Sequence, residues 1–206
     1  MTSSFKEQLP DEYHDIQDTL ESAKLILADA VPNAKTLFHT PVVSLSNGRD
    51  ISSRVMVLRE FDLDKRILRF HTDKRAAKIQ VINESNLASV VGYDPDLKVQ
   101  IKMTGNVDVH IKDKATEDAW SESTSRSKKC YSVKGGSSLK IQNPADYDIK
   151  DFEVEEGYEN FAVLIFNFIS LEFLYLRSSG HRRALHNWEG KYLSLIHISE
   201  PTRQSL

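Results

Sequence analysis

Basic and polar side chains recur in three short segments that the sequence places on neighbouring strands. These segments are RVMVLR (Arg54–Arg59), FHTDKRAAK (Phe70–Lys78) and VQIKMTG (Val99–Gly105). Alternate side chains of a strand face opposite sides, so Arg54 would share a face with Met56 and Leu58. An arginine in such an apolar strand needs an anionic partner, because an unpaired buried cation costs several kcal/mol. The three segments therefore predict an anion-binding site.

A phosphate group suits this pattern. Arg54 can hold a phosphate through two parallel hydrogen bonds, and Thr72 ends a predicted strand just before a helix, where hydroxyl and backbone N–H groups favour an anion. Lys78 is near enough along the chain to reach back over that helix, and Arg75 can join the same pocket. Gln100 offers both a donor and an acceptor, which suits the edge of a heterocycle.

Each of these residues also has a simpler explanation when it is taken alone. Arg59 and Arg75 can be solvated or salt-bridged, a glutamine in a strand usually pairs with backbone, and Lys78 can be a lysine on a helix surface. The phosphate hypothesis therefore depends on the joint arrangement of the residues.

The elements that would position these residues are mostly strands. Apolar residues three or four apart predict a helix over 11–30, and Asn47-Gly48 predicts a hairpin turn between strands 37–46 and 51–60. Further strands are expected over 67–72, 87–93, 98–111, 161–170, 171–177 and 181–186, with a bulge at Gly105. Helices are expected over 73–83, capped by Asp73, and over 113–122. The polar stretch 121–147 is expected to form a long loop. This pattern predicts an antiparallel barrel or sandwich with two or three helices.

Composition narrows the classes of function. The chain has 206 residues and a net charge of −3, which is unlike a general nucleic-acid binder. One cysteine, Cys130, excludes an intramolecular disulfide and a cysteine-based zinc site, and the histidines are not spaced for a metal. The longest apolar stretch is too short to span a bilayer. We expect a cytoplasmic protein without a metal and without a nucleic-acid or membrane partner.

The last residues differ in character from the rest. Residues 193–203 read LSLIHISEPTR, which looks like a translated sequencing adapter. We therefore expect one domain over 1–192 and a non-native tail over 193–206. The alternative is a native edge strand, because apolar residues partly alternate there.

In their order and spacing, the three segments resemble the FMN-binding motifs of the pyridoxamine 5′-phosphate oxidase-like split barrels, and most of all the bacterial flavin-binding domains of that family. The resemblance runs from about residue 20 to residue 188 and includes the hairpin LYLRSSGHRRA (Leu174–Ala184). It implies a mainly β fold, a six- to eight-stranded antiparallel split barrel with flanking helices. It also implies FMN as the cofactor and a homodimer with FMN at the interface.

The resemblance also implies roles for particular residues. Arg54 and Lys78 would hold the FMN phosphate, assisted by Thr72 and Arg75, while Gln100 would contact the flavin ring or the ribityl chain. Arg59 takes the position of a lysine near the flavin and the substrate phosphate, and the main chain of Val55–Leu58 would run beside the ring. A second subunit would contribute from residues 125–138 and from near Arg182 and Arg183. The full expected cofactor-binding set is Arg54, Val55, Met56, Val57, Leu58, Arg59, His71, Thr72, Arg75, Lys78 and Gln100.

This sequence also departs from the family pattern. Ala76 and Ala77 stand where the family usually has a serine and often an arginine, and the Arg-x-His pair of the true oxidases is not reproduced around His181. We therefore expect an FMN-dependent oxidoreductase of unknown substrate rather than an authentic pyridoxamine 5′-phosphate oxidase. No catalytic residue is assigned, because the flavin can accept hydride directly. The alternatives are a flavin-binding or sensing module without turnover, and a pyridoxal phosphate carrier.

Overall fold

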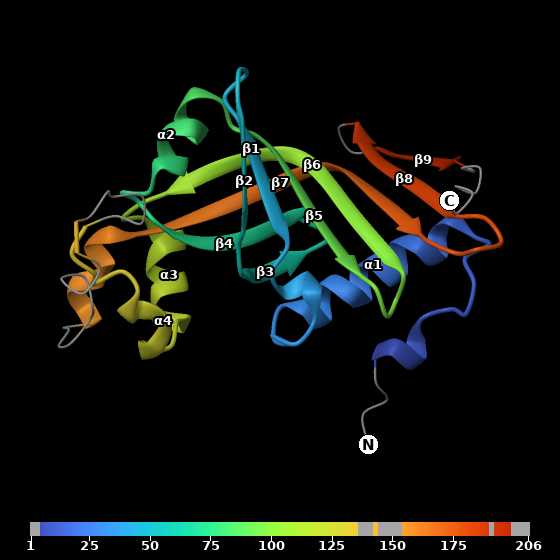
Figure 1. The fold of residues 1–206 in the computed structure, drawn as a ribbon, viewed down its shortest axis with the longest axis horizontal. Coiled ribbons are helices and arrows are strands. Elements are labelled where there is room, and N and C mark those ends of the chain that lie inside the picture. Colours follow the sequence, from blue (N-terminus) through green and yellow to red (C-terminus); the bar gives the residue numbers. More distant parts are fainter. Residues whose placement is uncertain (1–4, 136–141, 144–153, 190–191, 199–206) are drawn as a thin grey trace.

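The computed structural model describes residues 5–135, 142–143, 154–189 and 192–198. Its nine strands form one antiparallel sheet (Figure 1), which confirms the mainly β prediction. The strands are β1 (Val42–Ser46), β2 (Ile51–Val55), β3 (Leu58–Asp62), β4 (Ile67–Asp73), β5 (Leu87–Asp94), β6 (Val99–His110), β7 (Phe161–Tyr175), β8 (Arg182–Glu189) and β9 (Tyr192–Ile198). The helices are α1 (Ile16–Ala30), α2 (Ala77–Glu84), α3 (Lys114–Glu122) and α4 (Ser125–Lys129), with 3₁₀ turns over Phe5–Gln8, Leu37–His39 and Val154–Asn160. Within the described residues, no helix is long and apolar enough to cross a membrane.

The order of the strands brings two ends of the sheet together. The hydrogen-bonded path is β2-β1-β5-β6-β7-β4-β3, with β8 on β7 and β9 on β8. β2 and β3 stand at opposite ends of this path, yet only Met56 and Val57 separate them in the chain. The sheet must therefore curl until its two ends meet at Met56 and Val57. We call these two residues the seam.

The inside of the curled sheet holds the core. Residues that face one another across neighbouring strands, such as Val43, Val90 and Met103, are all buried there. β7 pairs with β6 along most of its length, with β4 near its start and with β8 near its end. The predicted bulge is confirmed, because the β6–β7 register shifts at Gly105. A Cβ there would collide with the carbonyl oxygen of Asn167, so this close approach requires glycine.

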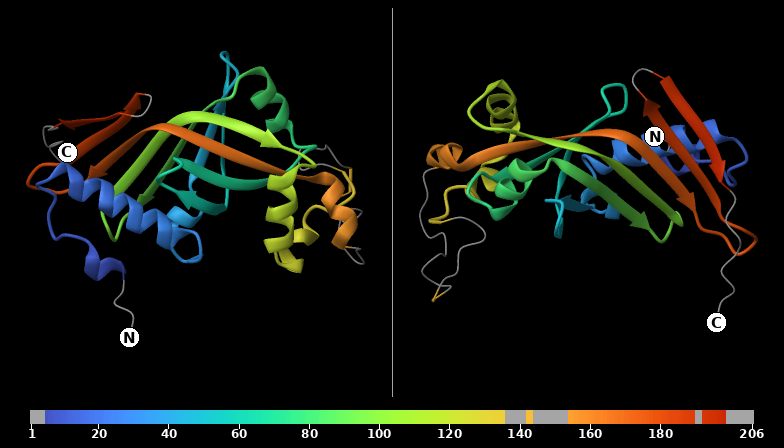
Figure 2. Two further views of the ribbon diagram at one scale, coloured as in Figure 1. Left: turned by 180° about the vertical axis from the view of Figure 1, so that it is seen from behind. Right: turned by 90° about the horizontal axis from the view of Figure 1, so that it is seen from above.

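Helices cover the two ends of the sheet. α1 begins after Asp15, whose carboxylate accepts the Gln17 N–H at 2.8 Å, and it buries Ala23 and Leu27 against the core. Figures 1 and 2 show α1 near one end of the long axis and α3 with α4 at the other. α3 begins with a capping box at Asp113.

Several predicted boundaries were wrong for local reasons. The strand expected over 37–46 starts only at 42, because Thr36 caps a 3₁₀ turn over Leu37–His39. The strand expected over 51–60 divides at the seam, and the strands expected over 161–170 and 171–177 are one strand, β7. α2 starts at Ala77 with Ala76 as its N-cap, because the Asp73 carboxylate accepts hydrogen bonds from Arg75 instead of capping the helix.

Two further expectations concern segments that border residues outside the described ranges. α4 lies within the loop expected over 121–147, and the later part of that loop falls largely outside the described residues. Residues 192–198 form β9 and pair with β8 in antiparallel register. The adapter origin of residues 193–206 stays a prediction.

Candidate functional site

A hollow of about 260 Å³ lies at the seam. It gathers every residue of the expected cofactor set except Leu58, Arg75 and Gln100, and it adds one aromatic side chain. The lining residues are Arg54, Val55, Met56, Val57, Arg59, His71, Thr72, Lys78 and Tyr131. None of these described lining residues is acidic, so the hollow combines several cations with no carboxylate of its own.

Arg54 and Lys78 supply the positive charge at the centre of the hollow. Lys78 Nζ donates to Thr72 Oγ1 at 3.0 Å. The Arg54 guanidinium donates to the Ser52 hydroxyl through Nη2, whereas Nη1 is buried without a partner. Burial lowers the pKa of Lys78, the nearby charge of Arg54 lowers it further, and the charge of Asp73 offsets part of this shift. Two cations that disfavour each other's charge, one with an unsatisfied donor, form a site that an anion would stabilise.

Local structure explains why these side chains meet. Arg54 pairs with Val43 and Ser52 with Leu45, so both polar residues point to the core side of β2, which ends next to the seam. Thr72 is the buried, next-to-last residue of β4. Because α2 begins shortly afterwards, Lys78 lies in its first turn and its side chain returns to Thr72.

A second hollow, of about 190 Å³, adjoins the first. Arg59 and His71 line both, so these two side chains form the shared wall. The second hollow is otherwise bordered by Val31, Arg69, Ala119, Glu122, Ser123, Thr124 and Ser127. Arg69 is neutralised there by Glu60 at 3.0 Å and Glu122 at 2.8 Å. Arg59 has no such partner among the described residues, and its Nε is buried and unpaired.

His71 is neutral in this setting. Burial, together with the charges of Arg69 and Arg59, lowers its pKa to about 3. The ring packs edge-on against Phe161, with centroids 5.0 Å apart, and Nε2 is buried without a partner. His71 can therefore offer a hydrogen bond to a ligand near pH 7, but not a positive charge.

Three residues of the expected set lie elsewhere. Leu58 is fully buried in the core. Gln100 faces the side of the sheet opposite to the core residues Val99 and Ile101, so it lies on the outer face. The Arg75 guanidinium is held by the Asp73 carboxylate, with Nη2–Oδ2 at 2.6 Å, and it also donates to the Val133 carbonyl at 3.1 Å.

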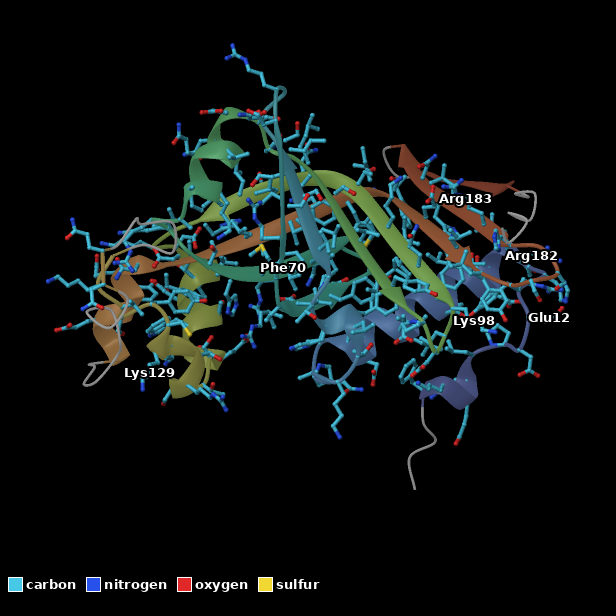
Figure 3. The ribbon with its side chains drawn as sticks, viewed as in Figure 1. Glu12, Phe70, Lys98, Lys129, Arg182 and Arg183 are labelled. Atoms are coloured by element: carbon cyan, nitrogen blue, oxygen red, sulfur yellow. The ribbon has the colours of Figure 1, made fainter. Side chains whose placement is uncertain are left out.

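The two segments expected to contribute from a second subunit lie far apart within one chain. Figure 3 shows Arg182 and Arg183 at one end of the molecule and Lys129, in α4, at the other. Arg183 is paired with Glu172 at 3.0 Å on the neighbouring strand. A single chain thus does not bring this hairpin to the seam.

Tyr131 is the residue of the hollow that sequence reasoning missed. It follows α4, inside a stretch that reads as a polar loop. Its ring packs edge-on against Phe161 and Trp120, with centroids 4.9 and 6.0 Å apart, and burial raises its pKa to about 12. The one available signal was an aromatic side chain within an otherwise polar segment.

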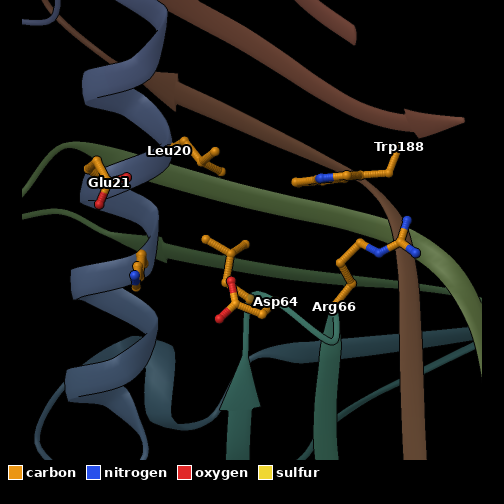
Figure 4. A pocket seen from close by; sticks show the side chains of 7 residues that line it. Leu20, Glu21, Asp64, Arg66 and Trp188 are labelled. Carbon is orange, nitrogen blue, oxygen red and sulfur yellow. The ribbon is translucent and has the colours of Figure 1, made fainter. Parts of the chain in front are cut away.

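A larger hollow, of about 480 Å³, lies between α1, the turn from β3 to β4, and β8. Figure 4 shows Leu20 and Trp188 on one side of it and Asp64 and Arg66 on the other. Its lining carries acidic side chains (Glu21, Asp64) as well as basic ones (Lys24, Arg66), so the charges balance. Compared with this hollow, the seam hollow is the better anion site, because its described lining carries basic side chains and no acidic one.

Comparison with known proteins agrees with this geometry. Residues 24–111 match the family model described as pyridoxamine 5′-phosphate oxidase, FMN-binding domain. This stretch includes every residue of the seam hollow except Tyr131. No curated protein sequence matches the chain.

Two solved structures share the fold over most of their length. A pyridoxamine 5′-phosphate oxidase-related, FMN binding protein from Nostoc punctiforme has a TM-score of 0.71 and 20% identity, over 87% of this chain and 96% of that one. PhzG from Burkholderia lata, solved in complex with tetrahydrophenazine-1-carboxylic acid, has a TM-score of 0.69 and 17% identity, over 97% of this chain and 98% of that one. Identities this low establish the fold alone. The chain thus folds as a split barrel, and its residues 24–111 match the FMN-binding domain of the pyridoxamine 5′-phosphate oxidase family.

Proposed function

We propose that this chain binds FMN, with the phosphate in the seam hollow, and acts as an FMN-dependent oxidoreductase. One observation carries the proposal: Arg54 and Lys78 converge with Thr72 on a hollow whose described lining has no carboxylate. A phosphate would pair with both cations and satisfy the buried Arg54 Nη1. The donor set therefore fits the phosphate group of FMN.

The neighbouring residues would hold the rest of the cofactor. The seam lies directly beside the cations, so the main chain of Val55, Met56 and Val57 would flank the flavin ring. When bound, FMN supplies the hydride and electron-transfer chemistry, and the protein supplies binding and orientation. Arg59 and His71 would offer a cation and a neutral hydrogen-bonding group on the far side of the hollow.

The adjoining second hollow favours turnover over a passive flavin module. It shares Arg59 and His71 with the seam hollow, so a second small molecule placed there would lie next to the cofactor. Its unpaired cation, Arg59, would attract an electron-rich or anionic group. The chemical identity of this substrate stays open.

The outer face of the sheet supports a homodimer with FMN at the interface. Apolar side chains there are left in solvent: Ile51 is 75% exposed, Val55 61%, Leu87 60% and Tyr93 42%. Val55 belongs both to this face and to the seam hollow, and Gln100 lies opposite Tyr93 on the same face. A second copy packed on this face would cover these apolar side chains and could bring its Gln100 or its β7–β8 hairpin to the cofactor.

Mass spectrometry of the molecule released from the purified protein tests the binding step. FMN is the expected species, and pyridoxal phosphate in its place would support a carrier instead. Anaerobic bleaching of the flavin absorbance by a reduced substrate, followed by recovery in air, would then separate an oxidoreductase from a module without turnover.

A further inference from the structure

We infer that Tyr131 contributes a direct phosphate contact, and that Arg75, expected from the sequence to touch the phosphate, instead holds the Tyr131 segment in place. This inference rests on the proposed function, because it concerns the same FMN phosphate. It adds one contact residue and one positioning residue to the site. Neither role follows from the three sequence motifs.

The Tyr131 hydroxyl is available to a ligand. Tyr131 lines the same seam hollow as Arg54, Thr72 and Lys78. Among the described residues its hydroxyl has no hydrogen-bond partner, and the groups that act on it electrostatically are Arg59, Cys130 and Asp73. A phenol held protonated by its surroundings can only donate to a phosphate oxygen near neutral pH, and never competes with it as an anion.

The ring is fixed rather than free. Phe161 and Trp120 pack against it edge-on, and the Asn160 side-chain amide donates to the Tyr131 carbonyl at 2.9 Å. The Tyr131 N–H donates to the Lys128 carbonyl at 3.0 Å, which continues the last turn of α4. A donor that is already oriented loses little conformational entropy when it binds a ligand.

Arg75 links this segment to β4. Its guanidinium donates to the Asp73 carboxylate through Nε–Oδ1 at 2.9 Å, Nε–Oδ2 at 3.1 Å and Nη2–Oδ2 at 2.6 Å, and Nη2 also donates to the Val133 carbonyl at 3.1 Å. Asp73 follows Thr72 directly, and Val133 lies two residues after Tyr131. The Asp73–Arg75–Val133 chain thus ties the Tyr131 segment to the strand that carries Thr72. Arg75 acts on the phosphate through this tie, without lining the hollow.

Titrations of the full chain with FMN and with riboflavin test both roles. Tyr131→Phe keeps the ring and removes only the hydroxyl. It should weaken FMN binding by about 10- to 100-fold, the range for one hydrogen bond to a charged group, and leave riboflavin binding unchanged. Tyr158→Phe is the matched control, because Tyr158 packs on the same Trp120 but its hydroxyl contacts Thr116, away from the hollow.

Arg75 is tested by a double-mutant cycle. Arg75→Gln should weaken FMN binding in the wild-type background and add little in the Tyr131→Phe background, because its effect passes through Tyr131. If Arg75→Gln weakened FMN binding by the same factor in both backgrounds, the positioning role would be refuted. Thermal melts without ligand check that each variant folds.

The outcomes separate this inference from the proposed function. If the wild type prefers FMN to riboflavin and Tyr131→Phe changes nothing, the phosphate site stands and the Tyr131 role is refuted. Equal weakening of FMN and riboflavin would also refute it, because the hydroxyl would then serve the ring. A wild type that binds neither flavin overturns the proposed function and this inference together.

Discussion

Arg54→Met is expected to separate cofactor binding from stability. Methionine keeps most of the side-chain volume and removes a partly buried cation that disfavours the charge on Lys78. Because none of the described lining residues is acidic, the substitution leaves no carboxylate without a partner. The ligand-free variant should therefore melt at the wild-type temperature or above it, while its affinity for FMN falls.

The magnitude follows from the lost phosphate contact. One charge-assisted hydrogen bond contributes about 1.5–3 kcal/mol, so the Kd for FMN should rise about 10- to 100-fold. At an FMN concentration of 100 times the wild-type Kd, binding stabilises the wild type by about 2.7 kcal/mol. That corresponds to a Tm increase of about 5–10 °C for a chain of this size. A variant whose Kd is 100-fold higher would gain only about 0.4 kcal/mol at the same concentration, or about 1 °C.

Paired thermal melts with and without FMN measure both effects. Arg49→Met serves as the control, because Arg49 is exposed in the β1–β2 turn and does not line the hollow. An Arg54→Met variant with an unchanged FMN-dependent Tm increase would refute the phosphate assignment. A large drop in the ligand-free Tm would show instead that Arg54 stabilises the fold.

Three further outcomes are expected. His186 is fully buried, 2.9 Å from Thr19 Oγ1, and burial lowers its pKa to about 4. Between that value and about 6.5 the unfolded chain binds more protons than the folded one, so the free energy of unfolding should fall by on the order of 3 kcal/mol as pH drops across this window. Denaturant melts at several pH values should show a weaker pH dependence of this free energy for His186→Gln than for the wild type. Pyridoxamine 5′-phosphate should be oxidised with a kcat/KM below about 10⁴ M⁻¹s⁻¹, and an oxygen-consumption assay above that value would contradict the expectation. A chain ending at Tyr192 should keep its FMN affinity and its Tm, whereas a loss well beyond about 2–4 °C would show that β9 belongs to the native barrel.

The seam hollow could be predicted from the sequence because its parts are local. Arg54 lies in an alternating strand, Thr72 ends a strand and Lys78 starts the next helix, so short-range rules bring each side chain close to its observed direction. The Lys78–Thr72 hydrogen bond confirms that Lys78 reaches back. Alternation also predicts one shared face for Arg54, Met56 and Leu58, and both apolar residues of this set are buried.

The remaining parts depend on contacts between distant segments. The sequence does not say that β2 and β3 stand at opposite ends of one hydrogen-bonded path, and it is this path that makes Met56–Val57 a seam. Alternation with the core residues Val99 and Ile101 puts Gln100 on the outer face, but only the pairing of β6 with β5 places it opposite Tyr93 there. Tyr131 lies far from Thr72 in the sequence, and only tertiary packing places it in the same hollow.

Arg75 shows how a nearby carboxylate can hold a cation that the sequence assigns to a phosphate. Its position beside Thr72 and Lys78 suggested a third phosphate cation, to replace contacts that Ala76 and Ala77 cannot make. The Asp73 carboxylate two residues away is a nearer anion, and it accepts hydrogen bonds from Nε and Nη2 of the guanidinium. This pairing also prevents Asp73 from capping α2, so the helix starts later and Lys78 falls in its first turn. The same local ion pair therefore removes one cation from the hollow and helps to place another, which leaves Arg54 and Lys78 as the two charges that a phosphate would neutralise.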